Sequence, residues 1–255
     1  MIEVFIITAL KDNYIYLIHE STTNKTAVVD PSEAEPVLAT LKKKEWTLDY
    51  IWNTHHHWDH TNGNLLLKKK TNATIVGSEK DAHRIPGIDI KLSESTEFIF
   101  GNTIVKVIET PGHTSGALCW WLKKDGILFT GDTLFSLGCG RLFEGTAEQM
   151  WDSLCKIRKL PKETKIYCGH EYTLMNCNFA LSLDPHNQQL QEKIIKIKGL
   201  RRRNQATVPV TLGEELQSNP FLRADDKQFK ASLQLKDASA SQVFANLRKL
   251  KDNYS

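Results

Sequence analysis

The stretch Thr54-His55-His56-His57-Trp58-Asp59-His60 decides how the rest of this chain is interpreted. It contains the pattern His-x-His-x-Asp-His, which places four side chains able to bind a metal ion within six residues. Imidazole nitrogens and carboxylate oxygens are the donors that suit zinc and neighbouring first-row metals. Few purely structural roles need such a cluster, so we interpret the segment as part of a metal site.

The spacing inside this segment indicates two ions. His55 and His57 are one residue apart, so on an extended segment both side chains point to the same side. His56 lies between them and is expected to point away from the metal. Asp59 and His60 are adjacent, and at a turn into a helix both can point towards a second ion.

Three more candidate ligands, His113, Asp132 and His170, each follow an expected strand and a turn residue. Strand ends that meet at one rim of a sheet are where α/β folds build their sites. Seven ligands are too many for one tetrahedral ion but suffice for two ions that share a carboxylate. Such a pair generates hydroxide at neutral pH and stabilises a developing oxyanion. The residues therefore predict a binuclear metallohydrolase.

Asp30 also lies at the end of an expected strand, and two interpretations stay open for it. Its carboxylate could orient a ligand imidazole from behind, or it could simply belong to the first turn of the next helix. The remaining histidines, His19, His83 and His186, are expected to have ordinary packing or surface roles.

The composition indicates an ordinary globular protein. Hydrophobic residues make up 40% of the 255 residues and charged residues 25%, which is typical of globular chains. No apolar run approaches the roughly 20 residues that span a bilayer, and the first residues read as a strand and not as a signal peptide. The five cysteines are scattered without a Cys-x-x-Cys pair, which favours reduced thiols and a cytoplasmic location. We expect no membrane association.

The net charge of +3 is unevenly distributed, because the basic excess follows residue 170. Such a bias could attract an anionic small molecule or nucleic acid, or it could be a solvated helical surface. The basic segment has no recognisable groove-reading motif and few aromatic residues for base stacking, so nucleic-acid binding is not expected.

Strand and helix signals alternate up to residue 170, and helix signals dominate afterwards. Strands are expected at 4–8, 14–18, 26–29, 50–52, 74–76, 103–108, 117–122, 127–130 and 165–168. Helices are expected at 32–44 with Ser32 as N-cap, at 63–70, from the capping box at Thr146 to near Pro161, at 172–183, from an N-cap at Asp184 to about 203, and at 239–251.

Four motifs together resemble the metallo-β-lactamase superfamily. They are Thr-His-x-His-x-Asp-His at 54–60, Pro-Gly-His-Thr at 111–114, Thr-Gly-Asp-Thr at 130–133 and Cys-Gly-His-Glu at 168–171. Three further segments, at 10–14, 138–146 and 219–223, resemble a narrower group within it, the glyoxalase II or hydroxyacylglutathione hydrolase family. The likeness runs nearly from end to end.

The resemblance implies both the fold and the ligand set. The implied fold class is α/β (α+β), with an αββα sandwich in residues 1–170 as the catalytic domain and a small helical, substrate-binding domain in residues 171–255. One metal ion would be bound by three residues, His55, His57 and His113. The other would be bound by Asp59, His60 and His170, and Asp132 would bridge the two ions.

The resemblance also implies five substrate contacts, at Arg141, Phe143, Tyr172, Arg248 and Lys251. Arg141 stands where relatives can have Lys, which keeps the cation but changes its geometry. Phe143 stands where Tyr can occur, so a hydroxyl contact is missing. Arg248 and Lys251 share one face of the last expected helix and could hold the glycine carboxylate of glutathione. The alternative for this pair is a solvated basic helix end.

The implied activity is hydrolysis of the thioester S-D-lactoylglutathione to D-lactate and glutathione, the second step of methylglyoxal detoxification. A hydroxide that bridges the two ions would attack the thioester carbonyl, Asp59 would orient it, and the metals would stabilise the oxyanion. We expect zinc, although the same ligands accept iron or manganese. A monomer is expected, and the run Arg201-Arg202-Arg203, which has no implied role, is expected at the surface.

Two other functions are compatible with the metal motif. A sulfur dioxygenase of the same superfamily would use one iron and glutathione persulfide, but such relatives generally lack the long helical segment that here follows His170. A nucleic-acid-processing or binding protein would need the basic C-terminal segment to bind a phosphate backbone, which would make its binding sensitive to salt.

Overall fold

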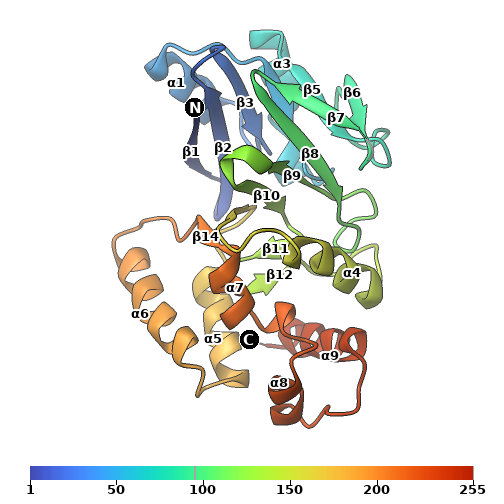
Figure 1. Cartoon of the computed structure of the whole chain (residues 1–255). Coiled ribbons are helices and arrows are strands. Elements are labelled where there is room, and N and C mark those ends of the chain that lie inside the picture. Colours follow the sequence, from blue (N-terminus) through green and yellow to red (C-terminus); the bar gives the residue numbers. More distant parts are fainter. Residues whose placement is uncertain (95, 255) are drawn as a thin grey trace.

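The computed structural model describes residues 1–94 and 96–254. These residues form two six-stranded sheets packed face to face, with helices outside them and a helical region beside the second sheet (Figure 1). The first sheet contains, in spatial order, β1 (Ile2–Ala9), β2 (Asn13–Glu20), β3 (Lys25–Val29), β4 (Tyr50–Trp52), β5 (Thr74–Ser78) and β6 (Ile90–Leu92).

The second sheet runs β14-β13-β10-β9-β8-β7. Its members are β7 (Glu97–Phe100), β8 (Thr103–Glu109), β9 (Leu118–Leu122), β10 (Ile127–Gly131), β13 (Lys165–Cys168) and β14 (Val210–Thr211). A small separate hairpin follows β10 and consists of β11 (Leu134–Phe135) and β12 (Gly138–Cys139).

The helices divide into two groups along the chain. Those of the sandwich are α1 (Glu35–Lys44), α2 (Trp58–Thr61), α3 (Asn64–Thr71) and α4 (Ala147–Arg158). The helical region contains α5 (Thr173–Leu183), α6 (Gln188–Arg202), α7 (Leu212–Ser218), α8 (Lys227–Ser232) and α9 (Ala240–Asp252). No helix in residues 1–94 or 96–254 is both long and apolar enough to cross a membrane.

Both faces of the first sheet are buried at its inner strands, β2 to β5. Aromatic side chains fill the space between the sheets, where Trp52 stacks on Trp120 with ring centroids 5.2 Å apart. On the outer face, Leu17 of β2 packs in one cluster with Val37 of α1 and Leu67 of α3. A strand covered on both sides reads as a continuous apolar run, and β2 is buried along its whole length. This is the αββα arrangement.

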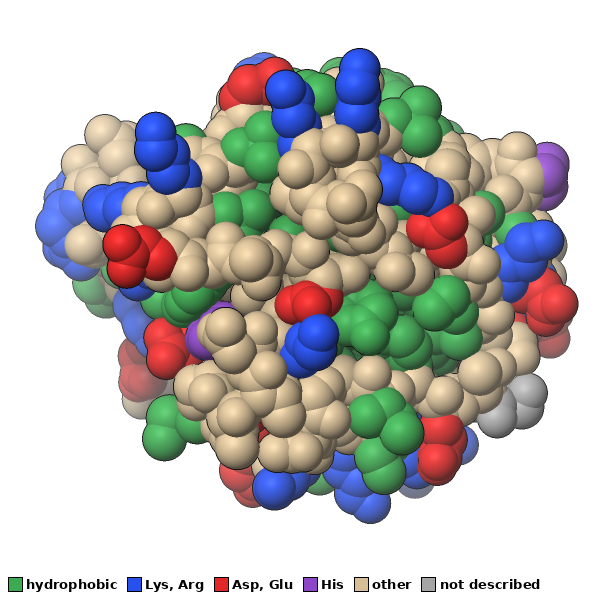
Figure 2. Space-filling view, turned by 90° about the horizontal axis from the view of Figure 1, so that it is seen from above, with side chains coloured by type: hydrophobic (Ala, Val, Ile, Leu, Met, Phe, Trp, Pro, Cys, Tyr) green, Lys and Arg blue, Asp and Glu red, His purple; other side chains and the backbone are tan. Residues whose placement is uncertain are grey.

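The outer face of the second sheet is covered by residues from both halves of the chain. Leu128 of β10 and Ile166 of β13 belong to the same buried cluster as Leu154 of α4 and Phe244 of α9. The helical region is thus packed onto the sandwich through a shared hydrophobic core. Figure 2 shows the end of the sandwich that lies away from the helical region. On this face, hydrophobic side chains lie between charged side chains of both signs.

Two expected helix starts are wrong. Helix α1 begins at Glu35 with Ala34 as N-cap, not at Ser32, and Pro36 lies in its first turn. Helix α6 begins after Asn187, whose side chain accepts the Leu190 amide. The carboxylate of Asp184, the expected cap, pairs with Arg223 at 2.6 Å instead.

The capping box expected at Thr146 is confirmed, and helix α9, for which no cap was predicted, begins with a capping box as well. Thr146 and Gln149 form a complete capping box at the start of α4, and Ser239 and Gln242 form another at the start of α9. The short elements β6, β7, β11, β12, β14, α2, α7 and α8 were not expected from the sequence. Each has eight residues or fewer, too short to show a clear periodicity.

Candidate metal centre and substrate cavity

The His-x-His-x-Asp-His segment lies where β4 leaves the first sheet and enters helix α2. His55 and His57 lie on the connection, with His57 as the N-cap residue, while Asp59 and His60 lie in the helix. His113 follows β8, Asp132 follows β10 and His170 follows β13. The sheet edges thus bring all seven expected ligands together.

Three imidazoles form the first group. The ligand-type atoms of His55, His57 and His113 all lie within 4.8 Å of one another. Nδ1 of His57 is 3.1 Å from Nε2 of His55 and 3.1 Å from Nε2 of His113. Ring nitrogens that converge so closely can share one cation.

The second group contains Asp59, His60 and His170, again within 4.8 Å. Asp132 lies between the two groups, because its Oδ2 is 3.5 Å from Nε2 of His113 and 3.3 Å from Nε2 of His170. Its Oδ1 is buried and makes no hydrogen bond to the described residues. Since buried polar atoms normally have partners, this oxygen is a suitable donor for a metal ion.

Three of these imidazoles are oriented by hydrogen bonds from their outward nitrogens. His60 Nδ1 donates to Asp30 at 3.0 Å, His170 Nδ1 donates to Asp12 at 2.9 Å, and His113 Nδ1 donates to the Arg141 carbonyl at 2.8 Å. Such outer partners fix the tautomer and direct Nε2 inwards, as in known metal sites. Asp30 therefore orients an imidazole. Asp12 was not singled out from the sequence, since nothing in the sequence relates it to His170.

Two glycines are required for these ligands to approach one another. Gly131 has a φ of +46°, and a Cβ there would lie 2.2 Å from Oγ1 of Thr54. A Cβ at Gly169 would lie 2.4 Å from Oδ1 of Asp132. Any larger residue would push apart the strand ends that carry Asp132 and His170.

The electrostatics of the centre favour a cation. Burial, followed by His113 and His56, lowers the pKa of His57 to about 4, and burial lowers the pKa of His55 well below its usual value. Burial opposes ionisation of Asp132, but His170 and His60 hold its pKa well below the usual range. The first group thus combines neutral imidazoles with an ionised carboxylate, the protonation states of metal ligands. In the second group burial is outweighed by Asp132 and Asp30, which raise the pKa of His60 to about 9.

A cavity of about 580 Å³ opens onto this centre. All five expected substrate contacts line it, namely Arg141, Phe143, Tyr172, Arg248 and Lys251. So do several residues not singled out from the sequence, among them Asp12, Met175, Asn176 and Tyr254. They come from three separate segments, and only the fold brings them together.

The contact residues are held in defined positions. The Tyr172 ring stacks on His170 with centroids 4.7 Å apart. Arg248 Nη1 donates to the Cys139 carbonyl at 2.9 Å, and Lys251 lies 5.3 Å above the ring of Phe179. Both Arg248 and Lys251 are buried, so a solvated helix end is the wrong interpretation of this pair.

Arg202 and Arg203 lie at the surface, as expected, whereas Arg201 is only partly exposed and has a charged partner. Its Nη1 lies 3.3 Å from the carboxylate of Glu171. The same carboxylate accepts hydrogen bonds from Thr207 at 2.8 and 3.0 Å and from the Tyr14 hydroxyl. Glu171 thereby ties β2 of the sandwich to the end of α6, directly beside His170.

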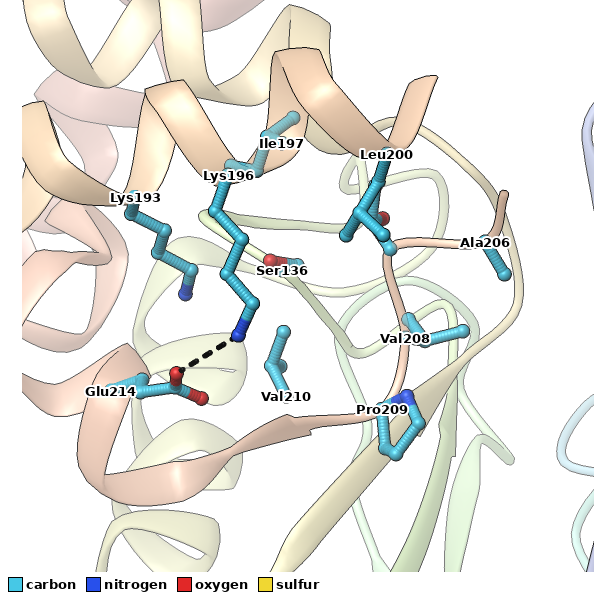
Figure 3. A pocket seen from close by; sticks show the side chains of 11 residues that line it. Ser136, Lys193, Lys196, Ile197, Leu200, Ala206, Val208, Pro209, Val210 and Glu214 are labelled. Carbon is cyan, nitrogen blue, oxygen red and sulfur yellow. Dashed lines mark ion pairs between the residues drawn. The ribbon is translucent and has the colours of Figure 1, made fainter. Parts of the chain in front are cut away.

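A second cavity of about 110 Å³ lies between α6 and the segment 206–214 (Figure 3). Lys196 approaches Glu214 at 3.9 Å across it, and Lys193 lies 2.5 Å from the buried carboxylate of Glu215. Both lysines are therefore paired with carboxylates. The cavity is far smaller than the one at the metal centre, which remains the candidate functional site.

The fold and centre define the class of protein first. Residues 10–170 match the family model of the metallo-beta-lactamase superfamily. A crystal structure of ETHE1 from Myxococcus xanthus covers 99% of this chain and 96% of its own, with a TM-score of 0.70 and 25% identity. The BLEG-1 B3 metallo-beta-lactamase structure has a TM-score of 0.66 at 22% identity, over 87% of this chain and 99% of that one.

The narrower family follows from the rest of the chain. Residues 171–254 match the model described as the hydroxyacylglutathione hydrolase C-terminus. The hydroxyacylglutathione hydrolase of Methylococcus capsulatus is 50% identical over 99% of this chain and 98% of its own. That of Rhodospirillum rubrum is 50% identical over 97% of both. The chain belongs to the hydroxyacylglutathione hydrolase family.

Proposed function

We propose that this protein hydrolyses S-D-lactoylglutathione, a 2-hydroxyacyl-glutathione thioester, to D-lactate and glutathione, as the second step of methylglyoxal detoxification. One observation carries the proposal: a cavity lined by four cationic side chains, Lys11, Arg141, Arg248 and Lys251, opens directly onto the candidate metal centre. The chain can therefore hold an anionic peptide while its thioester lies at the centre.

The donor set fits two divalent ions, for which we propose zinc. His55, His57 and His113 would hold one, and Asp59, His60 and His170 the other. Asp132 would bridge them, since its carboxylate faces both groups. Two such ions supply an activated water and stabilise negative charge on the carbonyl oxygen. Iron and manganese accept the same ligands.

The chain's own residues would orient the reactants. Asn13 Nδ2 donates to Oδ2 of Asp59 at 3.1 Å, which would hold this carboxylate at the centre, where it would accept a hydrogen bond from the attacking water and orient it. The guanidinium of Arg248 and the ammonium of Lys251 would bind the glycine carboxylate through charge-assisted hydrogen bonds. A thiolate is a good leaving group, so no separate acid is needed at the sulfur.

Steady-state hydrolysis of S-D-lactoylglutathione, with metal analysis of the same sample, tests this proposal. The matched comparison is S-D-lactoyl-N-acetylcysteamine, which has the same acyl group but lacks the peptide carboxylates. We expect about two ions per chain, loss of activity on chelation, and kcat/KM at least about 100-fold higher for the glutathione thioester. Equal kcat/KM values would contradict the glutathione site, and full activity without metal would contradict the centre.

A further inference from the structure

A network of charged side chains lies behind the metal-ligand loop. Asp81 is fully buried, and its Oδ2 lies 3.0 Å from Nδ1 of His56, the residue between the first two ligands. Its Oδ1 accepts from Nη2 of Arg84 at 2.6 Å. His56 therefore has a defined partner on the side away from the candidate metals.

Arg84 extends this network to Glu144. Its Nη1 and Nη2 both donate to the Glu144 carboxylate, the second at 3.0 Å. Oε2 of Glu144 also accepts the backbone amide of Ser115 at 2.7 Å, and Oε1 lies 3.7 Å from Nε2 of His56. We call these five residues, His56, Asp81, Arg84, Ser115 and Glu144, the Arg84 clamp.

The clamp joins three loops that build the cavity and the centre. Glu144 lies in the 141–145 segment, which has neither helix nor strand and carries Arg141 and Phe143. The Phe143 ring lies 5.1 Å from that of His113 and 5.7 Å from that of His57. Apart from the clamp, backbone bonds from Phe143 and Gly145 to the 112–113 segment hold this loop, together with the bond from His113 Nδ1 to the Arg141 carbonyl and an ion pair between Arg141 and Asp252 at 3.8 Å.

The geometry of the clamp indicates a rigid connection. A Cβ at Gly116 would lie 2.3 Å from the Asp81 carboxylate, so the 113–116 loop packs directly against it. Arg84 bonds Glu144 through two nitrogens, and such bidentate pairs are stronger and more directional than single contacts. An isolated surface pair contributes little, but Arg84 joins Glu144 at the surface to Asp81, whose carboxylate is buried.

We propose that Arg84 is a positioning residue for substrate binding, which holds the loop of Arg141 and Phe143 against the metal-ligand loop. An ordered loop binds the thioester without first losing conformational freedom, so its binding is tighter. Ordering the loop stabilises the bound substrate and the transition state equally. Loss of Arg84 is therefore expected to raise KM and to leave kcat unchanged. This inference rests on the proposed thioesterase function.

The test is Arg84→Met, compared with Arg158→Met. Arg158 makes a bidentate pair with Asp225, at 2.9 Å for both contacts, and its side chain is 25% exposed, close to the 27% of Arg84. With zinc-loaded enzyme, we expect KM for S-D-lactoylglutathione to rise about tenfold in Arg84→Met, with kcat within about threefold of wild type. Metal content should stay unchanged, and Arg158→Met should keep the wild-type KM.

Hydrogen–deuterium exchange provides a measurement that needs no substrate. The amides of Ser115, Phe143 and Gly145 should exchange faster in Arg84→Met than in Arg158→Met. A wild type without thioesterase activity would contradict the proposed function, and the exchange result would still decide the role of the clamp. Active enzymes with equal KM and equal exchange in both variants would overturn this inference alone, as would a fall in kcat at constant KM.

Glu144→Gln keeps the inference testable if Arg84→Met does not fold, because it preserves shape while removing the charge. We expect the same direction of change in KM and a smaller effect on stability. In a double variant, the two changes should raise KM by much less than the product of the single effects, since both break one contact. Independent, multiplicative effects would show that Arg84 and Glu144 do not act together.

Discussion

Among the described residues, Asp132 has carboxylate oxygens near imidazoles of both groups of candidate ligands. It lies directly after β10, and Gly169 leaves the space that its carboxylate occupies. Its buried Oδ1 has no hydrogen bond among the described residues. A side chain in this position is expected to serve both ions at once, so its loss should affect the two sites together.

Replacing Asp132 with Ala should therefore reduce the metal content from about two ions to one or fewer. We expect kcat to fall by at least about 100-fold, because the activated water depends on both ions. Metal analysis and steady-state kinetics on one preparation measure both effects. Asp225→Ala, which removes a carboxylate from an exposed ion pair, is the control. Two bound ions and wild-type kcat in Asp132→Ala would refute the bridging role.

We expect Lys251 to make substrate binding dependent on pH. Burial, together with Arg248 and Arg141, lowers the pKa of Lys251 to about 8. The ammonium is charged below that pH and neutral above it, so the attraction for a substrate carboxylate is lost as pH rises through about 8. We expect KM to increase about tenfold between neutral pH and the alkaline side of this pKa.

Lys251→Arg separates this effect from titration of the substrate. Arginine stays charged throughout the range, so KM of the variant should stay flat where that of the wild type rises. Titration of the substrate's own amino group affects both enzymes equally. Parallel KM profiles for the two enzymes would exclude Lys251 as the titrating group.

At the scale of elements, helix α9 places Arg248 and Lys251 in the cavity. The start of this helix is defined by hydrogen bonds between residues near its first turn. Oγ of Ser239 accepts the Gln242 amide at 3.2 Å, and Oε1 of Gln242 accepts the Ser239 amide at 2.8 Å. This reciprocal pair satisfies two amides that the helix leaves free. Arg248 and Lys251 lie two turns or more beyond it, where the helix is buried.

Ser239→Ala should lower the free energy of unfolding by about 1 kcal/mol, the usual effect of losing an N-cap. Ser239→Asp should remain close to wild type, because aspartate also caps helices and suits the positive end of the helix dipole. Urea denaturation of the two variants measures the difference. We expect kcat to be unchanged in both, and equal stability of the two variants would argue against the cap.

For the whole molecule, the sandwich and the helical region share one hydrophobic core. The cluster on the outer face of the second sheet joins Leu128 and Ile166 to Phe221 and Phe244. The buried Glu215 adds polar connections, accepting from the Leu137 amide at 2.7 Å and from Asn219 at 2.9 Å. Separating the two parts would expose apolar surface and leave buried polar groups without partners.

The two parts should consequently unfold in one transition. All six tryptophans precede residue 170, so their fluorescence reports on the sandwich, whereas far-UV circular dichroism is dominated by helices, most of which follow residue 170. We expect the two signals to give the same denaturant midpoint. A helical signal lost at lower denaturant than the fluorescence change would show that residues 171–255 unfold independently.

Local patterns in the sequence were sufficient for the elements whose residues interact with near neighbours. The buried strands, the capping box at Thr146 and the last helix near 239–251 follow from periodicity and capping chemistry. The cap of α6 did not, because Asp184 is recruited by Arg223, 39 residues away. Competition from a distant partner of this kind has no local signature.

The sequence by itself determined the kind of centre, because His-x-His-x-Asp-His and the three strand-end residues carry their donor chemistry wherever the chain places them. Only the tertiary structure decided which groups meet. It paired Asp12 with His170 and Asp30 with His60, buried Arg248 and Lys251 in a cavity, and joined Arg84 to Glu144. The residues joined by these hydrogen bonds are between 30 and 158 positions apart in the sequence. They come within reach because the two sheets and the helices pack together, not because they are neighbours in the chain.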